Sequence, residues 1–312
     1  MSGSRILALG HYQPSRVLTN AELETLVETN DEWIRSRVGI ETRRIAADDE
    51  TVEDMAGNAA EKAIAGSGLV PRDIDFVIVA TCTAVDRSPN TAARVALRLG
   101  MESPAVLDVN VVCSGFTHAL ALADHAIRAG SATNALVIGV DKLSAVTDWT
   151  DRTTCILVGD GAGAAVLTAS DQAEIGPVLW GSVPSLSSAV RIGGEPTRFA
   201  QDGQAVYRWT TTQLPIIVKQ ACERGGVSPE ELGAVVFHQA NLRIIEPLAR
   251  KLGAVNAVIA TDVTESGNTS AASIPLAFSK LVEQGRIAMK APVLLFGFGG
   301  NLSYAGQVVR CP

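Results

Sequence analysis

Short apolar runs alternate with amphipathic stretches along most of the chain. The stretch TVEDMAGNAAEKAIAGSGL, from Thr51 to Leu69, spaces its apolar residues at helical intervals, begins at a threonine that can cap the first turn, and ends near a glycine. Five apolar runs predict buried strands: DFVIVAT, AVLDVNVV, NALVIGV, AVVFHQA and PVLLFGF. Strands that alternate with helices in this way are typical of an α/β protein.

The second half of the chain repeats the pattern of the first. GLVPRDIDFVIVAT from Gly68 resembles GVSPEELGAVVFHQ from Gly226, and ALVIGV from Ala135 resembles VLLFGF from Val293, both at an offset of 158 residues. Two units of common origin are the simplest explanation, and chance similarity between βα units is the alternative. We therefore predict an N-terminal half, residues 1–172, and a C-terminal half, residues 173–312. The irregular segment 184–204 is expected on the surface between them.

The repeat places three reactive side chains at related positions. CSGFTHALALADHAIRAG aligns without a gap with NTSAASIPLAFSKLVEQG at an offset of 155, which pairs Cys113 with Asn268 at the starts of two helices. His238 ends the strand that corresponds to the one ending at Ala80. If the halves pack about a pseudo-twofold axis, these helix starts and strand ends converge. We therefore expect Cys113, His238 and Asn268 in one pocket.

A cysteine, a histidine and an asparagine in one pocket suit acyl transfer. A helix start favours an anion, so we expect it to lower the pKa of the Cys113 thiol and to promote the nucleophilic thiolate. A neutral histidine and an asparagine amide can donate hydrogen bonds to an oxygen that gains negative charge. On local sequence alone, a small buried hydrophobic role for the cysteine is the competing interpretation.

Composition narrows the function classes. The chain has 312 residues, of which 47% are hydrophobic, and a net charge of −7, which disfavours a nucleic-acid partner. No apolar run reaches the ~18 residues of a membrane span, and the N-terminus lacks the features of a signal peptide. The five cysteines are scattered without metal-ligand or CxxC spacing, which indicates a reduced, cytoplasmic protein.

Other motifs have structural interpretations. GDGAG, residues 159–163, lacks the Lys-Ser/Thr that follows in a phosphate loop, so close backbone packing is expected there. His118 and His125 lie seven residues apart with no accompanying acidic or thiol ligand, and no metal site is predicted. His11 has no identifiable partner in the sequence.

Six stretches together resemble β-ketoacyl-acyl-carrier-protein synthase III, a family of condensing enzymes with the thiolase fold. The resemblance covers essentially the whole chain. It rests on the region around Cys113 and on five further motifs: TNDEWIRSRVGIETR (29–43), DRTTCILVGDGAGAAVL (151–167), FHQANLRII (237–245), GNTSAASIP (267–275) and GFGGNLSYAGQVV (297–309). It implies a five-layered α/β/α/β/α sandwich of two pseudo-symmetric halves, in a homodimer.

The resemblance also implies a reaction. Cys113 takes an acyl group from acyl-coenzyme A, and malonyl-acyl carrier protein then loses carbon dioxide. His238 and Asn268 stabilise the enolate, whose carbon attacks the acyl group. The backbone N–H groups of Cys113 and Gly300 form the oxyanion hole. No metal or organic cofactor is implied, since decarboxylation itself generates the carbanion and coenzyme A is part of the substrate.

The resemblance also implies which residues contact the substrates. Trp33 and Arg152 match the residues that hold the coenzyme A adenine between them. Arg37, Asn241 and Arg243 match contacts to its pantetheine and phosphate end, and Arg243 also matches a contact to the acidic carrier protein.

The family also suggests where the acyl group lies. Ser88 precedes Pro89 at the position that reaches the partner's acyl pocket, and Leu143 and Val158 match further pocket residues. Ser88 and Val158 are small where relatives have aromatic rings, which predicts that the pocket accepts branched or medium-length primers.

The sequence departs from the family pattern at a few positions. Val112 stands where many relatives have a smaller residue, and Asn301 where they often have glycine, although asparagine tolerates a left-handed backbone. The segment between Asp160 and His238 is several residues shorter than usual.

Three functions follow from the sequence. We favour initiation of fatty-acid synthesis by condensation. The alternative is a starter-unit condensing enzyme or acyltransferase of polyketide or specialised metabolism. A thiol hydrolase is disfavoured because His238 and Asn268 match enolate-stabilising motifs, and a non-catalytic scaffold because all three reactive residues are present.

Overall fold

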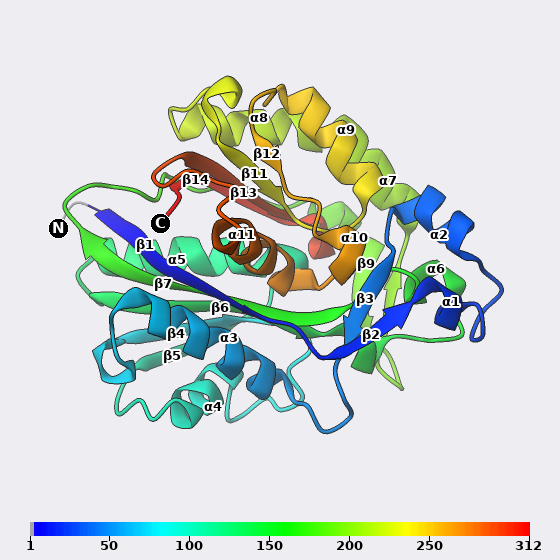
Figure 1. The fold of residues 1–312 in the computed structure, drawn as a ribbon, viewed down its shortest axis with the longest axis horizontal. Coiled ribbons are helices and arrows are strands. Elements are labelled where there is room, and N and C mark those ends of the chain that lie inside the picture. Colours follow the sequence, from blue (N-terminus) through cyan, green and yellow to red (C-terminus); the bar gives the residue numbers. More distant parts are fainter. Residues whose placement is uncertain (1–2) are drawn as a thin grey trace.

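A computed structural model describes residues 3–312, and its centre is built from two five-stranded sheets (Figure 1). In spatial order, the first sheet contains β1 (Gly3–Tyr12), β7 (Asp160–Ser170), β6 (Asn134–Lys142), β4 (Phe76–Ala80) and β5 (Ala105–Val109). The second contains β8 (Leu179–Gly181), β14 (Tyr304–Arg310), β13 (Pro292–Phe298), β11 (Ala234–Phe237) and β12 (Val258–Ile259). In both sheets the second strand is antiparallel to the first and to the third, whereas the third, fourth and fifth strands are parallel to one another. This shared topology supports the duplication.

Helices form three layers around the two sheets. Figure 1 shows α3 (Val52–Ser67) and α4 (Thr91–Arg98) outside the first sheet, and α5 (Gly115–Arg128) and α11 (Ser273–Glu283) between the sheets. It also shows α8 (Leu214–Arg224) and α9 (Leu242–Leu252) over the second sheet. This arrangement confirms the predicted five-layered α/β/α/β/α sandwich. No helix within residues 3–312 has the length and apolar character needed to cross a membrane.

Shorter elements complete the chain. The remaining helices are α1 (Asn20–Leu23), α2 (Asp31–Val38), α6 (Arg152–Cys155), α7 (Gly203–Thr212) and α10 (Val263–Ser266). Two further sheets have two antiparallel strands each: β2 (Arg16–Thr19) pairs with β3 (Thr42–Ile45), and β9 (Val190–Gly193) forms a hairpin with β10 (Arg198–Gln201). The 3-10 turns are η1 (Pro71–Asp73), η2 (Val112–Ser114), η3 (Leu143–Val146), η4 (Pro184–Ala189), η5 (Pro229–Glu231), η6 (Ser270–Ala272) and η7 (Gly300–Leu302).

The predicted elements agree with the structure, with one difference in burial. Helix α3 begins after Thr51, whose side chain forms a capping box with Asp54, and it ends at Gly68 with φ 77°. The strand predicted from AVLDVNVV is β5, but it is not buried. Its first three residues are exposed because β5 is the outermost strand of the first sheet. Apolar composition alone does not distinguish an edge strand from a central one.

The alignment that paired Cys113 with Asn268 is wrong by three residues. The turns η2 and η6 correspond, since Val112 and Ser270 each begin one with φ 49°, and this places Cys113 opposite Ala271. The difference arises because α5 has 14 residues and α11 has 11, so the three extra residues lie in the helix. Asn268 therefore lies just before the second turn, whereas Cys113 lies within the first.

Two glycines let the helix starts approach the sheets closely. A Cβ on Gly139 of β6 would lie 2.3 Å from the carbonyl oxygen of Ala271, and a Cβ on Gly297 of β13 would lie 2.8 Å from the Cα of Ser114. Because neither position has room for a side chain, the starts of α5 and α11 pack directly against strand backbone. This packing brings the loops that carry the reactive residues together at one end of the two sheets.

Candidate active site

Cys113, His238 and Asn268 line one cavity, as the sequence predicts. Cys113 comes from η2, His238 directly follows β11, and Asn268 lies between α10 and η6. All three side chains are nearly inaccessible, with exposed fractions of 7%, 1% and 8%. The rest of the cavity wall is mostly apolar: Val112, Leu143, Val190, Ile192, Phe199, Gln201, Val206, Ala240, Ile244, Ser270, Phe298 and Gly299.

The thiol of Cys113 is protonated in this structure at neutral pH. The pKa of the thiol is raised to about 11, mainly by burial and to a lesser extent by the nearby charge of Asp141. Hydrogen bonding from the Ser270 side chain and from the backbone N–H groups of Gly300 and Cys113 lowers the pKa but does not offset burial. The expected lowering of this pKa by the helix start is therefore wrong, because desolvation of the thiolate is the larger effect.

His238 is held as a neutral hydrogen-bond donor. Its Nδ1 lies 2.7 Å from the hydroxyl of Ser273, and that hydroxyl accepts a longer hydrogen bond from the backbone N–H of Gln239. The Ser273 proton is then free to be donated to Nδ1, and we assign the imidazole proton to Nε2 on this basis. Burial lowers the pKa of His238 to about 3, and Phe298 packs edge-on against the ring. The imidazole can therefore donate a hydrogen bond, but it is a very weak base.

Asn268 presents its amide nitrogen to the cavity. Its side-chain oxygen accepts the backbone N–H of Ser270 at 2.9 Å, so the NH₂ group remains as a donor. Its backbone is fixed on both sides, since its N–H donates to the Leu157 carbonyl and its carbonyl accepts the Gly159 N–H. Two neutral donors, from Asn268 and His238, thus line the same cavity as the thiol.

The loop after β13 closes over the thiol. A Cβ on Gly299, whose φ is 155°, would lie 2.8 Å from the Cys113 sulfur, so only glycine fits there. Asn301 has φ 59°, in agreement with its expected tolerance of the left-handed region. Val112 packs against Gly300 and has φ 49°, which is strained for a β-branched residue.

The predicted coenzyme A residues gather around α2 and α6. The Arg152 guanidinium lies 5.0 Å from the centroid of the Trp33 ring, and that of Arg37 lies 5.7 Å from it. The Arg243 side chain donates a hydrogen bond to the backbone carbonyl of Ser36, which lies on α2 with Trp33 and Arg37. A purine base between Trp33 and Arg152 would require the guanidinium to move outward, away from the Glu28 carbonyl to which it now donates.

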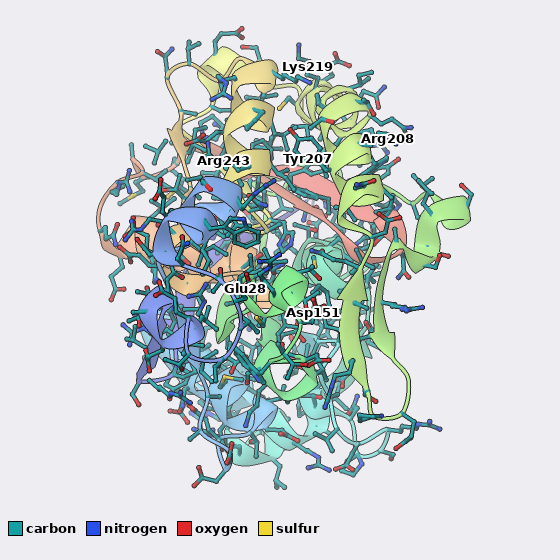
Figure 2. The ribbon with its side chains drawn as sticks, turned by 90° about the vertical axis from the view of Figure 1, so that its right-hand side faces the viewer. Glu28, Asp151, Tyr207, Arg208, Lys219 and Arg243 are labelled. Carbon is teal, nitrogen blue, oxygen red and sulfur yellow. The ribbon has the colours of Figure 1, made fainter. Side chains whose placement is uncertain are left out.

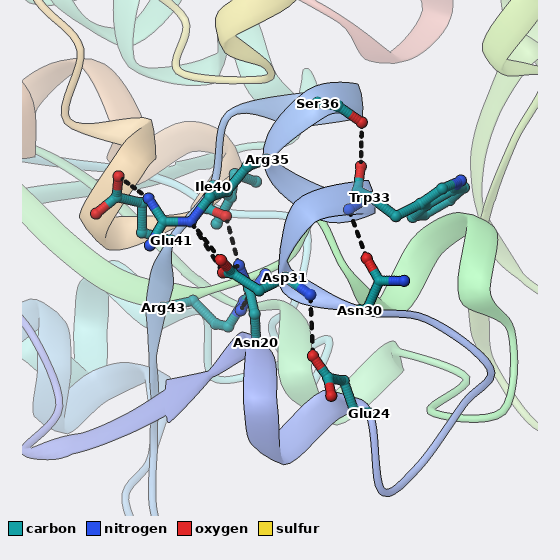
Figure 3. A network of polar contacts seen from close by, with 10 residues as sticks. All are labelled: Asn20, Glu24, Asn30, Asp31, Trp33, Arg35, Ser36, Ile40, Glu41 and Arg43. Atoms are coloured by element: carbon teal, nitrogen blue, oxygen red, sulfur yellow. Dashed lines mark hydrogen bonds and ion pairs between the residues drawn. The ribbon is translucent and has the colours of Figure 1, made fainter.

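Polar contacts fix the position of Trp33. Figure 3 shows that Asn30 caps α2 by accepting the Trp33 N–H, while Asp31 pairs with Arg35. Asn20 donates to Asp31 and to the carbonyl of Ile40, which ties the helix to the loops on both sides. The indole points away from this network, toward α6.

Asn241 caps a helix, and of the three predicted acyl-pocket residues only one lines the cavity. The side-chain oxygen of Asn241 caps α9 by accepting the Arg243 N–H, which leaves only its NH₂ group for a substrate. Leu143 lines the cavity. Val158 is buried and forms a backbone bridge with Asn268, but it is not part of the cavity wall, and Ser88 is exposed on its loop.

The segment 184–204 forms one wall of the site. Val190 and Ile192 on β9, with Phe199 and Gln201 on β10, face the cavity. Most of the segment is exposed, as expected, but it is not irregular, because two of its strands pair into a hairpin over the catalytic loops. The alternation of Val190 and Ile192 around Arg191, followed by two glycines, is the signal that could have revealed it.

The remaining histidines have packing roles. His118 stacks on Trp180 at 5.6 Å between ring centroids, and His125 meets the same ring edge-on at 5.8 Å. His11 lies 2.9 Å from the Ser279 hydroxyl. Across the described part of the chain, no group of three or more His, Cys, Asp or Glu side chains is arranged to hold a metal ion.

Family models match both halves of the chain. Residues 107–184 match 3-oxoacyl-[acyl-carrier-protein (ACP)] synthase III, and residues 222–311 match the C-terminal domain of the same family. A Streptomyces avermitilis protein named β-ketoacyl-[acyl-carrier-protein] synthase III 2 is 71% identical, over 100% of both chains. A Mycobacteroides abscessus protein named β-ketoacyl-[acyl-carrier-protein] synthase III is 43% identical, over 98% of this chain and 94% of its own.

Solved structures show the same fold. The priming β-ketosynthase of the R1128 polyketide pathway superimposes with a TM-score of 0.97 at 36% identity, covering 99% of this chain and 96% of its own. The 3-oxoacyl-[acyl-carrier-protein] synthase III of Aquifex aeolicus gives a TM-score of 0.94 at 38% identity, with coverages of 99% and 100%. Both likenesses extend over nearly the whole molecule.

Proposed function

This chain belongs to the 3-oxoacyl-[acyl-carrier-protein] synthase III family of condensing acyltransferases, and on that premise we propose how its residues perform the reaction. Cys113 carries the acyl group, while His238 and Asn268 act on the enolate. The observation that carries this assignment is that one buried cavity holds a thiol and two neutral donors.

The first half-reaction transfers the acyl group from acyl-coenzyme A to Cys113. The cysteine sulfur bonds to the acyl carbon, the bond to the coenzyme A sulfur breaks, and the thiol proton ends on coenzyme A. The N–H groups of Cys113 and Gly300 already act on the cysteine sulfur in the unliganded protein. We assign them as the oxyanion hole, which stabilises the thioester oxygen as it gains negative charge.

The second half-reaction forms the carbon–carbon bond. The malonyl group loses carbon dioxide, and its enolate oxygen accepts hydrogen bonds from His238 Nε2–H and from the Asn268 NH₂ group. The enolate carbon attacks the acyl carbon, and the Cys113 sulfur leaves and takes up a proton. A thiol hydrolase would instead need a general base, and a histidine with a pKa of about 3 is unsuited to that role. This chemistry requires neither a metal nor an organic cofactor.

Residues on α2, on α6 and on the helices over the second sheet suit the two substrates. Trp33 and Arg152 offer an aromatic face and a planar cation to the adenine of coenzyme A, while Arg37 and Asn241 are assigned to its phosphate and pantetheine portion. Figure 2 shows Arg243, Arg208 and Lys219 on one face of the molecule, over α7, α8 and α9. We propose that an acidic acyl carrier protein docks on this face.

The exposed edge of the first sheet supports a homodimer. Within residues 3–312, no strand pairs with the outer edge of β5, and its Val106 and Leu107 are more than a third exposed. Pairing of two β5 strands would cover this edge. In such a dimer, Ser88 would reach the acyl pocket of the partner subunit. All five cysteines are free thiols, which supports a cytoplasmic location.

We propose that initiation of fatty-acid synthesis is the role of this enzyme. A starter-unit role in polyketide synthesis is the second candidate, favoured by the structural likeness to the R1128 priming β-ketosynthase. Both roles use the same site, so the primer decides between them. A preference for acetyl or short branched acyl-coenzyme A would favour the first role, and a specialised starter the second.

One experiment tests the chemical assignment. The protein is incubated with acyl-coenzyme A and malonyl-acyl carrier protein, and product mass and carbon dioxide release are recorded. Cys113→Ala should abolish condensation, whereas Asn268→Ala should lower decarboxylation by about 10²–10³-fold and still permit acylation of Cys113. Cys222→Ala is the matched control, since burial also raises the pKa of that thiol to about 11 but Cys222 lies in α8. Loss of acylation in Asn268→Ala with decarboxylation retained would show that the roles are wrongly assigned.

A further inference from the structure

Asp141 is a fully buried carboxylate at the end of β6 that the proposed mechanism does not use. Its Oδ1 accepts the backbone N–H of Cys82 at 2.8 Å and the hydroxyls of Thr81 and Thr83 at 3.1 and 2.9 Å, and the Cys82 thiol lies 3.3 Å away. Its Oδ2 accepts the backbone N–H of Ala271 at 3.0 Å. The two oxygens therefore join a loop of the first half to the catalytic turn of the second.

These contacts favour the ionised form of the side chain, whereas burial raises the pKa of the carboxyl. The N–H groups of Cys82 and Ala271 can only donate, so each oxygen must accept. Thr83 accepts the N–H of Lys142 and is therefore free to donate to the carboxylate. No cation pairs with Asp141 among residues 3–312. A buried anion held only by neutral donors is costly to desolvate, and it persists where the fold depends on its geometry.

The contact with Ala271 leads directly to the enolate site. Ala271 follows Ser270, whose φ of 49° is strained for a residue other than glycine. The N–H of Ser270 donates to the side-chain oxygen of Asn268, which decides where the Asn268 NH₂ group points. Asp141 thus holds the residue that follows the strained Ser270, and Ser270 in turn orients the amide. Because rigid contacts transmit small displacements, movement at Ala271 would reach Asn268.

We infer that Asp141 is a positioning residue for the condensation reaction: through Ala271 and Ser270 it holds the Asn268 amide in the orientation that the malonyl-derived enolate requires. The inference rests on the proposed role of Asn268. The same carboxylate also faces Cys113, whose other titratable neighbours are His238 at the end of β11 and Cys82 in the loop after β4. Its negative charge disfavours the Cys113 thiolate, so the charge and the geometry of Asp141 have separable effects.

Two substitutions separate these effects. Asp141→Asn keeps the shape and removes the charge, but its single oxygen cannot accept both fixed N–H groups. In Asp141→Asn the amide oxygen should take the place of Oδ1, where several donors converge. The NH₂ group then replaces Oδ2 and faces the Ala271 N–H, so the hydrogen bond from Ala271 is lost. Asp141→Glu keeps the charge but moves both oxygens by one methylene. Asp108→Asn is the matched control, because Asp108 also accepts two backbone N–H groups, at 2.8 Å each, but at the start of α4.

The first measurement compares the two half-reactions. Asp141→Asn and Asp141→Glu should each lower malonyl decarboxylation by about tenfold to a hundredfold more than they lower acylation of Cys113. Asp108→Asn should change the ratio of the two rates by less than about threefold. Equal losses of both rates in the Asp141 variants, or no loss, would overturn the inference. Asp141→Glu serves alone if Asp141→Asn does not fold.

The second measurement needs no substrate. The rate of Cys113 alkylation by iodoacetamide, measured against pH, should move to lower pH in Asp141→Asn and stay as in the unmodified protein in Asp141→Glu. Crystal structures of both variants should show residues 268–271 displaced. An unmoved turn in Asp141→Asn would contradict the inference, because the turn reports the geometry that Asp141 imposes, whereas the alkylation profile reports its charge. If the unmodified protein releases no carbon dioxide from malonyl-acyl carrier protein, the proposed function fails, while the alkylation profile and the crystal structures still test Asp141.

Discussion

Acidification should weaken the fold through His238, and the size of the effect follows from its burial. The folded-state pKa of about 3 lies well below the ordinary value of 6.5, so the unfolded chain binds more protons between these two values. Stability from this histidine is therefore fully present above pH 6.5 and is lost as the pH falls. Between pH 8 and pH 5 the loss is about 2 kcal/mol of unfolding free energy for this one side chain.

Urea unfolding at pH 8 and pH 5 measures this loss of unfolding free energy. The free energy of unfolding should fall by about 2 kcal/mol more in the unmodified protein than in His238→Asn, because only the former carries the buried imidazole. Each variant is compared with itself at the two pH values, so the direct cost of the substitution cancels. Samples are kept dilute and at one protein concentration, since the isoelectric point is ≈ 5.2 and association changes apparent stability.

An exposed histidine provides the control for the buried His238. His125→Asn removes an exposed histidine on α5 and should leave the pH dependence of the unmodified protein intact. If His238→Asn shows the same loss on acidification as the unmodified protein, His238 is already protonated or hydrated in the folded state. The imidazole would then not be the neutral Nε2–H donor on which the enolate site depends.

Three further predictions concern the thiol and the acyl pocket. Alkylation of Cys113 by iodoacetamide should accelerate about tenfold per pH unit from pH 7 to pH 10, because the thiolate fraction grows in this way below a pKa of about 11, and a flat profile would show a thiolate already formed. Val112→Ala should raise kcat/KM for branched primers relative to acetyl-coenzyme A, since Val112 narrows the cavity next to the thiol; an unchanged ranking would place the limit elsewhere. Ser88→Phe should restrict a panel of acyl-coenzyme A primers, from acetyl to dodecanoyl, to the shortest chains if this loop enters the partner subunit's pocket, and unchanged kcat/KM values across the panel would argue against that placement.

Local sequence determined the elements and the identity of the reactive residues. The cap at Thr51 and the glycine at 68 bound α3 as predicted, because both act through the chain immediately beside them. The repeat at an offset of 158 predicted two similar halves, and the two sheets have the same topology. The convergence of Cys113, His238 and Asn268 also followed from the repeat, although the residue pairing was shifted by the longer α5.

Tertiary structure decided the electrostatics and the walls of the site. The helix start suggested a lowered pKa for Cys113, but the thiol's burial, which depends on Gly299 and on the far end of the chain, raises it. The hairpin of β9 and β10 became a cavity wall only by folding over loops remote in sequence. Asp141 carries no local sign of its role, because its partners, Cys82 and Ala271, come from opposite halves of the chain. Desolvation and long-range hydrogen bonding arise from neighbours distant in sequence, and so only the folded molecule specifies them.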